Sequence, residues 1–185
     1  TTSKPVNQIQ FAFRNHWKVF KSIIKKSKLK SNRVLEVGCG RGSLSAYFAD
    51  NKWDCSLLDS SKKAIDLAKK YFKKNKLTAS FTVADCKKLP FYNNSFDVVF
   101  SIGLFEHFKN PEQAIKEQIR VLDKNGIFIG YIVPKIKNNV QIDYEWINQI
   151  FLLNSKQNKS KPSIKKKIFR TTHMSNYYVK ILKKL

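Results

Sequence analysis

The chain has 185 residues and a formal net charge of +23, from 36 Lys and Arg against 13 Asp and Glu. This length suits one domain with a proper hydrophobic core, no segment approaches the ~20 apolar residues that span a bilayer, and the N-terminus has no signal-peptide pattern. Three cysteines, odd in number and without a C-x-x-C spacing, indicate reduced thiols in a cytoplasmic protein.

The first predicted element is an amphipathic helix over residues 7–28, whose apolar residues recur at helical spacing: Phe11, Trp17, Phe20, Ile23 and Ile24. A short buried strand is expected at 33–37, because an apolar run there is bounded by glycine. Gly38, Gly40 and Gly42 then permit a tight turn and a close approach of the backbone to a ligand.

A helix over 44–51 follows the glycines, and strand, glycine turn and helix together predict a nucleotide-binding element of a doubly wound sheet. The dinucleotide fingerprint G-x-G-x-x-G is not met, because Ser43 stands where its third glycine belongs. Glu36 at the strand end repels a pyrophosphate and favours a cationic ligand, and Asp59 ends the next strand, where a carboxylate suits a ribose diol. The implied ligand has an adenosine-like ribose, a positive centre and a carboxylate, and no phosphates.

The remaining elements alternate between strands and helices, which predicts parallel pairing with right-handed crossovers. The expected fold class is therefore α/β, a Rossmann-like doubly wound and mainly parallel sheet. Further strands are expected at 54–59, 80–84, 97–101 and 127–133. Further helices are expected from a Ser61 cap to Lys76, from Pro111 to Leu122, and over 175–185.

Several segments, in chain order, resemble the motifs of the class I S-adenosylmethionine-dependent methyltransferases. Residues 36–42 (EVGCGRG) resemble motif I, 84–91 (ADCKKLPF) the loop after the third strand, 94–101 (NSFDVVFS) the fourth strand, and 110–114 with 120–126 the helix and turn before the fifth strand. One such motif is weak support, and four in register are strong. The resemblance runs from about Leu29 to Val133 and is nearest to the small-molecule, quinone-biosynthesis-like branch (methyltransferase type 11).

This resemblance implies S-adenosyl-L-methionine as the cofactor. The family's aspartate that meets the adenine amino group corresponds to Asp85, and Cys39 and Cys86 are expected to offer backbone contacts rather than reactive thiols. No residue is assigned to a metal. The cofactor-binding residues that the resemblance implies are Glu36, Gly38, Cys39, Gly40, Asp59, Ser60, Asp85, Cys86, Ser101 and Ile102.

Methyl transfer requires alignment of the nucleophile with the methyl group, and a base only where the nucleophile arrives protonated. His107, just beyond the strand at 97–101, is the candidate base, because imidazole is matched to neutral pH. The alternative is a histidine that hydrogen-bonds nearby backbone. Glu106 is the second catalytic candidate, with three open roles: orienting His107, contacting the cofactor, or contributing to a metal site.

Other side chains have weaker assignments. His16, beside Trp17, either touches the substrate or has a surface or packing role, and His173 is a candidate cap for the last helix. The aromatic residues after the fifth strand are either walls of the acceptor pocket or simply core: Tyr144, Trp146, Phe151, Phe169, Tyr177 and Tyr178.

We expect a single methyltransferase domain over 1–185, with a lid helix in 1–30, a cofactor-binding core in 31–133, and a substrate-covering segment with the last helix in 134–185. The resemblance implies two further strands after that helix, for which no residues remain. The sequence therefore favours a truncated form of a longer enzyme over a fifth strand left at the sheet edge.

The predicted function is methylation of a small molecule at oxygen, nitrogen or carbon, without membrane insertion. The base-gripping Asn/Asp-Pro-Pro-aromatic motif is absent after the fourth strand, as is the cysteine needed for carbon-5 pyrimidine methylation. Two alternatives stay open. An RNA methyltransferase is favoured by the net charge, but lysines outnumber arginines by 31 to 5 and phosphate recognition prefers arginine. A catalytically inactive binding protein of the same fold is the other. The oligomeric state is left undetermined.

Overall fold

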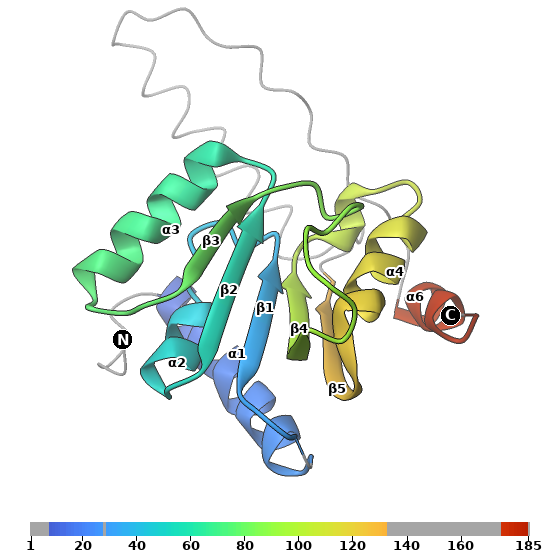
Figure 1. Ribbon diagram of the computed structural model, residues 1–185, viewed down its shortest axis with the longest axis horizontal. Coiled ribbons are helices and arrows are strands. Elements are labelled where there is room, and N and C mark those ends of the chain that lie inside the picture. Colours follow the sequence, from blue (N-terminus) through green and yellow to red (C-terminus); the bar gives the residue numbers. More distant parts are fainter. Residues whose placement is uncertain (1–7, 28, 133–174, 185) are drawn as a thin grey trace, which may run out of the picture.

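The computed structural model of the chain describes residues 8–27, 29–132 and 175–184. In this part of the chain a five-stranded sheet carries helices on both faces (Figure 1). The strands are β1 (Arg33–Val37), β2 (Asp54–Asp59), β3 (Ser80–Val83), β4 (Phe96–Ile102) and β5 (Leu122–Tyr131). The helices are α1 (Gln8–Lys25), α2 (Ser45–Asp50), α3 (Lys62–Lys74), the short 3-10 helix η1 (Phe105–His107), α4 (Glu112–Val121) and α6 (Ser175–Leu182).

The strands pair in the order β3-β2-β1-β4-β5, and every pairing is parallel. This confirms the predicted doubly wound α/β class. From β1 the chain adds β2 and β3 on one side and then returns to place β4 on the other side of β1. The loops that follow β1 and β4 therefore leave in different directions, which opens a crevice at the carboxyl edge of the sheet.

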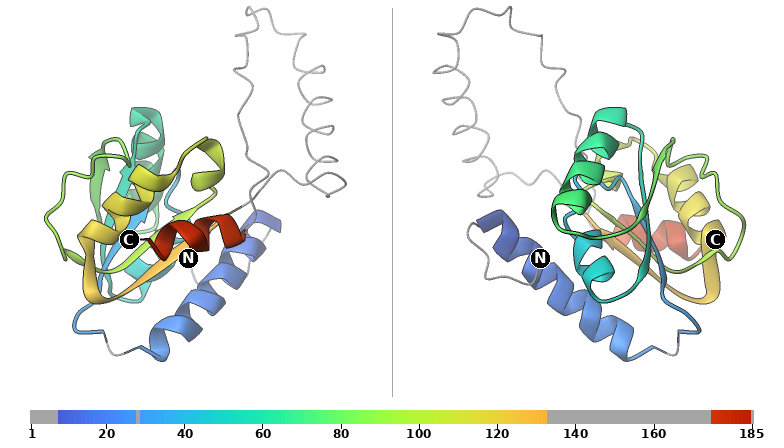
Figure 2. Two further views of the ribbon diagram at one scale, coloured as in Figure 1. Left: turned by 90° about the vertical axis from the view of Figure 1, so that its right-hand side faces the viewer. Right: turned by 60° about the vertical axis from the view of Figure 1, so that its left-hand side comes forward.

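Alternate residues of the central strands supply two separate cores. Val34 and Phe100 pack with residues of α1, α2 and α3 on one face, while Leu35, Val37 and Val99 pack with residues of α4 and α6 on the other. Figure 2 shows α1 and α4 on opposite sides of the molecule. Because β1 and β4 are covered on both faces, their sequences are nearly continuous apolar runs.

Aromatic side chains anchor α1 to its face of the sheet. Trp17 meets Phe48 edge to face with ring centroids 4.9 Å apart, and Phe20 meets Phe100 in the same way at 5.4 Å. Phe48 in turn stacks on Phe100 at 5.4 Å. Such pairs contribute about 0.5–1.5 kcal/mol each beyond the area they bury. The N-terminal helix is therefore part of the core and not an appendage to it.

The apolar face predicted for this helix is correct for Trp17, Phe20 and Ile24, which pack against the core. It is wrong for Phe11 and Ile23, which stay 55% and 39% exposed. Phe13 is the fourth inward residue, and spacings of four, three and four residues make a single helical stripe. The periodicity was strong enough to identify the helix, but too permissive to exclude residues flanking the stripe.

Most element boundaries lie close to the predicted ones. The Ser61 side chain caps α3 by accepting a hydrogen bond from the Ala64 N–H at 3.3 Å, as predicted. β5 starts earlier than expected, because Leu122 pairs with Phe96 before the ladder is interrupted and resumes further along. Gly126 lies in the interruption, where a Cβ would approach the Leu122 side chain to 2.6 Å.

α6 packs Tyr178 and Ile181 into the core on the α4 face, and β3 and β5 are the outer strands of the described sheet. Among the helices of the described residues, none combines the length and the apolar character needed to cross a bilayer.

Candidate functional site

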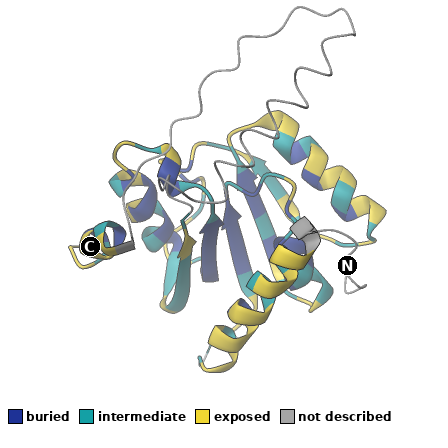
Figure 3. Ribbon diagram, turned by 180° about the vertical axis from the view of Figure 1, so that it is seen from behind, coloured by how far each residue is buried: buried dark blue, intermediate teal, exposed yellow. Residues whose placement is uncertain are grey.

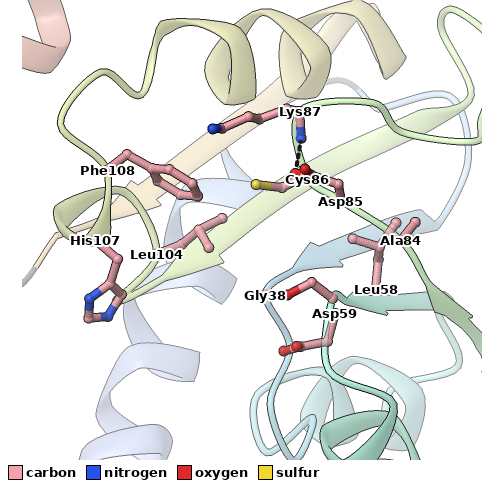
Figure 4. Close-up of a pocket in the computed structure, with 12 residues that line it drawn as sticks. Gly38, Leu58, Asp59, Ala84, Asp85, Cys86, Lys87, Leu104, His107 and Phe108 are labelled. Atoms are coloured by element: carbon pink, nitrogen blue, oxygen red, sulfur yellow. Dashed lines mark hydrogen bonds between the residues drawn. The ribbon is translucent and has the colours of Figure 1, made fainter. Parts of the chain in front are cut away.

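A pocket of about 420 Å³ opens at the carboxyl edge of the sheet. Its volume lies within the ~300–1,000 Å³ range usual for ligand sites. Residues at the ends of β1 and β2 form one wall, the segment after β4 forms the opposite wall, and the loop after β3 closes the site between them (Figure 4). The lining residues are Gly38, Leu58, Asp59, Ser60, Ala84, Asp85, Cys86, Lys87, Gly103, Leu104, His107 and Phe108.

Four backbone N–H groups of the glycine turn after β1 are bonded within the protein. Those of Gly38 and Cys39 donate to the Leu58 carbonyl at 2.8 and 3.0 Å, and that of Gly42 donates to the Cys39 carbonyl at 2.7 Å. The Gly40 N–H donates to the carboxylate of Asp59 at 2.9 Å. A phosphate-binding turn leaves such donors free for the anion. These four N–H groups are therefore not available to a pyrophosphate.

Two glycines of this turn serve different purposes, although both have positive φ, +52° at Gly40 and +71° at Gly42. A Cβ on Gly42 would lie 2.4 Å from Cδ2 of Leu57 and 3.0 Å from the Phe72 ring, so this glycine is required for the turn to pack on α3 and β2. A Cβ on Gly40 would meet nothing within 4 Å. Gly42 is therefore required by packing, whereas Gly40 borders open space.

The carboxylate of Asp59 is fixed in position by backbone donors. Its Oδ2 accepts from the Gly40 N–H and its Oδ1 from the Ser61 N–H, both at 2.9 Å. Each oxygen keeps a further lone pair, so the carboxylate can accept hydrogen bonds from two neighbouring hydroxyl groups without moving. Asp59 and the adjacent Ser60 both line the pocket, and their contact with a cofactor stays a prediction.

Glu36 lies beneath the turn and outside the pocket lining. It is 4% exposed, and its Oε2 accepts from the hydroxyl and the N–H of Ser45, at 2.5 and 3.3 Å. Burial raises the pKa of this carboxyl to about 8, although the hydrogen bonds from Ser45 oppose the shift. Glu36 is therefore largely protonated at neutral pH in this structure, and its contact with a cationic ligand stays a prediction.

The loop after β3 brings Asp85, Cys86 and Lys87 to the pocket. Asp85 accepts from the Lys87 N–H at 2.9 Å, which closes a local turn (Figure 4). Burial raises the pKa of the Cys86 thiol to about 11 and also raises that of Cys39. Neither thiol is available as a thiolate near neutral pH, and the backbone contacts expected of the two residues stay a prediction.

Two side chains of α4 hold this loop in place. Glu117 accepts from the Leu89 N–H at 2.7 Å, and Arg120 donates to the carbonyls of Leu89 and Phe91 at 2.9 and 2.8 Å. Arg120 also donates to Glu117 at 2.7 and 2.8 Å. Sequence reasoning did not identify this pair. Its only signal is a Glu followed three residues later by an Arg, which says nothing about a loop partner.

The two catalytic candidates on η1 face different surroundings. Glu106 is 1% exposed and does not line the pocket, whereas His107 is exposed and lines it. Figure 4 shows His107 on the wall opposite Gly38 and Asp59. Within the described residues, no three His, Cys, Asp or Glu side chains come close enough together to hold a metal ion.

Some lining residues were not predicted. Lys87 and Phe108 join two walls, because the Lys87 ammonium lies 5.1 Å from the centre of the Phe108 ring, within cation–π range. No sequence signal links them. The remaining unpredicted members follow directly from the strand ends: Leu58, Ala84, Gly103 and Leu104.

Other predicted cofactor-binding residues lie near the pocket but outside its lining: Cys39, Gly40, Ser101 and Ile102. Ser101, near the end of β4, is 1% exposed, and its hydroxyl has no hydrogen-bond partner in this structure. A buried hydroxyl without a partner is costly, and a ligand in the crevice between β1 and β4 is one way to satisfy it.

His16 lies at the carboxyl edge of the sheet as well. Its ring centre is 4.6 Å from that of Tyr131, which pairs with Ile102 at the end of the β4–β5 ladder. Burial lowers the pKa of His16. His16 therefore packs on the sheet end, outside the pocket lining.

Tyr177 and Tyr178 belong to the core on the α4 face and do not line the pocket. The remaining candidate wall residues and the candidate cap lie outside the described residues: Tyr144, Trp146, Phe151, Phe169 and His173.

Comparison with known proteins gives consistent results. A protein-family model described as "Methyltransferase domain" matches residues 35–130. A ubiquinone biosynthesis O-methyltransferase of Pelagibacter ubique is 34% identical over 72% of this chain and 55% of its own length. A cyclopropane-fatty-acyl-phospholipid synthase of Escherichia coli is 31% identical over 72% of this chain and 35% of its own length. The chain thus spans about half or less of these relatives.

Among solved structures, the PH0226 protein of Pyrococcus horikoshii is 27% identical. It aligns with a TM-score of 0.61 over 77% of this chain and 62% of that protein. Sequence and structure comparisons therefore agree on the fold.

Proposed function

The chain belongs to the class I S-adenosylmethionine-dependent methyltransferases, and we propose that it transfers a methyl group to an oxygen, nitrogen or carbon nucleophile of a small molecule. The observation that carries the proposal is a glycine turn in which four N–H groups are already bonded within the protein, next to the fixed carboxylate of Asp59. When bound, S-adenosylmethionine supplies a methyl group activated by its sulfonium centre. The chain's own residues bind the cofactor, orient the acceptor and shield both from water.

The described residues fit this cofactor on three counts. The turn has four of its N–H groups bonded internally, which favours a ligand without phosphates. Asp59 keeps lone pairs for two ribose hydroxyls, and the Ser101 hydroxyl has no partner of its own. We propose that Asp59 and Ser60 hold the ribose and that Asp85 and Cys86 hold the adenine.

The amino-acid end of the cofactor is assigned to the turn and to Glu36. A bound ammonium group would favour the ionised form of Glu36 and lower its pKa from about 8. Gly38, Cys39, Gly40 and Ile102 would offer backbone contacts around it, as the family resemblance implies.

His107 is proposed as the base that accepts a proton from the acceptor. It is exposed on the pocket wall opposite Asp59. With the cofactor bound along the Asp59 wall, His107 would face the acceptor across the pocket. Glu106 is buried behind it on the same turn. We assign Glu106 to orienting η1 and hence His107, because a buried side chain outside the lining is poorly placed to touch the acceptor.

A small-molecule acceptor is supported by the relatives, since the names of both similar proteins describe chemistry on small molecules or lipids. We further propose that residues 1–30 and 134–185 cover the acceptor in a single domain with the core at 31–133. A cytoplasmic location is supported by three cysteines that are all free and buried.

The proposal is tested by methyl transfer from labelled S-adenosylmethionine to a panel of phenols, amines, unsaturated acyl lipids and RNA. The expected result is a labelled small-molecule product that depends on Asp59. Label found only in RNA would replace the small-molecule acceptor by RNA. An absence of product with every acceptor, together with intact cofactor binding, would favour the inactive binding protein.

A further inference from the structure

Helix α1 has one side that packs on the sheet and one side that faces away from it. The helix packs inward through Phe13, Trp17, Phe20 and Ile24. Its other side combines cations with large apolar side chains, and Figure 3 shows it exposed along the back of the molecule. We call the following residues the α1 outer face: Phe11, Arg14, Lys18, Val19, Lys21, Ile23 and Lys25.

The charge of this face is entirely positive. The first 35 residues of the chain contain nine Lys and Arg and no Asp or Glu. The first acidic side chain is Glu36, which is buried. The four ion pairs of the described residues use Arg33, Lys62, Lys116 and Arg120, so none of them neutralises the α1 outer face.

The same face exposes three large apolar side chains. Phe11 is 55% exposed, Val19 57% and Ile23 39%. Their spacing of eight and four residues keeps them on one side of the helix. A single exposed apolar residue is ordinary, but a row of three beside four lysines and arginines is typical of a helix that lies in a membrane interface.

Helix α3 provides an internal comparison, because it is at least as rich in lysine. It carries six lysines in 13 residues, but Asp66 pairs with Lys62 at 3.3 Å. Its one large exposed apolar side chain is Leu67, at 48%. High lysine content is therefore common to both helices. Of α1 and α3, α1 alone combines it with a row of exposed apolar side chains.

We propose that the α1 outer face binds the surface of an anionic lipid bilayer. Phe11, Val19 and Ile23 enter the boundary between headgroups and acyl chains, and the cations contact headgroup phosphates. Nucleic acid is the weaker match, because only one of the cations is an arginine and phosphate binding makes no use of exposed aliphatic side chains.

The docked orientation has a consequence for the pocket. His16 contacts Tyr131 at the end of β5, so the N-terminal half of α1 runs beside the carboxyl edge of the sheet. A bilayer held by the α1 outer face is thus brought close to the edge at which the pocket opens.

Co-sedimentation with vesicles at ~0.1 M salt tests the proposal. The full chain should bind vesicles of equal parts phosphatidylglycerol and phosphatidylcholine at least tenfold more tightly than pure phosphatidylcholine. Replacing Phe11, Val19 and Ile23 together by Ser should weaken binding about tenfold. Reversing Lys18, Lys21 and Lys25 to Glu should weaken it 100-fold or more, since each lysine contributes about fivefold.

Matched variants on α3 are the controls. Lys69, Lys70 and Lys73 reversed together to Glu make the same three charge changes on exposed positions, and Leu67→Ser removes the large exposed apolar side chain of α3. Both variants should stay within threefold of the unmodified chain. Unchanged circular dichroism melting and unchanged binding of S-adenosylhomocysteine confirm that every variant is folded.

Three results would overturn the proposal. Equal loss from the α3 and α1 charge reversals would show that net charge alone drives binding. Unchanged vesicle binding by the variant with Phe11, Val19 and Ile23 replaced by Ser would show that these side chains do not enter the membrane interface. Tighter binding of a duplex RNA than of anionic vesicles, lost only with the charge reversal, would assign the face to nucleic acid.

Discussion

The two walls of the pocket are built in different ways. The wall after β1 and β2 is mostly backbone, with four N–H groups of the glycine turn bonded to neighbouring carbonyls and to Asp59. The wall after β4 is mostly side chain, with His107 projecting from a 3-10 helix of three residues and Phe108 beneath Lys87. One wall is fixed by local chain geometry, and the other depends on which side chains distant segments supply.

This difference suggests a division of labour. A rigid wall whose donors are already satisfied suits a ligand common to a whole family, and a wall of exchangeable side chains suits a ligand particular to one member. Substitutions in the two walls should therefore separate cofactor binding from turnover, and the following variants are ordered from the largest expected effect to the smallest.

His107→Asn should lower kcat by about 100- to 10,000-fold, the range for loss of a general base, while S-adenosylhomocysteine affinity stays within twofold. The measurement is steady-state turnover of the acceptor found in the methyl-transfer panel. Lys109→Ala, at an exposed neighbouring position outside the lining, is the control and should retain activity. Equal turnover by His107→Asn and the control would remove the base assignment and leave His107 a packing or backbone-bonding role.

Asp59→Ala should weaken S-adenosylhomocysteine binding about 100-fold, or about 3 kcal/mol, because hydrogen bonds to a charged group contribute about 1.5–3 kcal/mol each. Equilibrium dialysis with labelled ligand measures it. Asp54→Ala changes an exposed aspartate at the other end of the same strand and should leave affinity unaltered. Similar losses from both variants would mean that strand β2, and not a diol contact, is being perturbed.

Gly42→Ala should destabilise the fold by about 2–3 kcal/mol, because the new Cβ would clash with Leu57 and sit at positive φ. Gly40→Ala lacks the clash and should cost only about 1 kcal/mol, yet it should weaken cofactor binding, since its Cβ enters the open space beside the turn. Urea unfolding measures the loss of stability, and titration with S-adenosylhomocysteine measures the loss of cofactor binding. A Gly40 variant that binds normally would show that this space is not used by the ligand.

Glu36→Gln should change the pH dependence of stability. The pKa of Glu36 is raised to about 8 by burial, so between pH ~4.5 and ~8 the folded chain keeps a proton that the unfolded chain loses. The unmodified protein should therefore lose stability as pH rises through this window, by up to about 1.4 kcal/mol per pH unit. The Gln variant should lack this slope in urea unfolding from pH 5 to 8. Equal slopes of unfolding free energy against pH in the two proteins would show that a group other than Glu36 holds the proton.

The contrast between the walls also explains what could be predicted from the sequence. The strands, the Ser61 cap and the pocket positions of Gly38, Asp59 and Asp85 follow from short local patterns, since parallel strand ends converge on one edge of the sheet. The contact between Lys87 and Phe108 and the hold of Arg120 on the loop after β3 join residues 21 to 31 positions apart. No local pattern encodes such pairings.

The sequence also could not predict which of several candidate side chains are buried. Glu36 was expected to meet a ligand, and for Glu106 a ligand contact was one of three open roles. The structure places both outside the pocket lining, because a carboxyl beside a strand end can face either the crevice or a helix. Phe11 and Ile23 were expected inward and lie outward, since an apolar residue flanking a helical stripe satisfies the periodicity equally well on either side.

Calorimetric titration with S-adenosylhomocysteine, and separately with NAD, tests the central claim most directly. A glycine turn with four amides already bonded, beside a fixed Asp59, predicts saturable one-to-one binding of the sulfur nucleoside and none of the pyrophosphate dinucleotide at the same concentration. Preferential binding of NAD, or S-adenosylhomocysteine affinity that is identical in the Asp59→Ala variant, would contradict it.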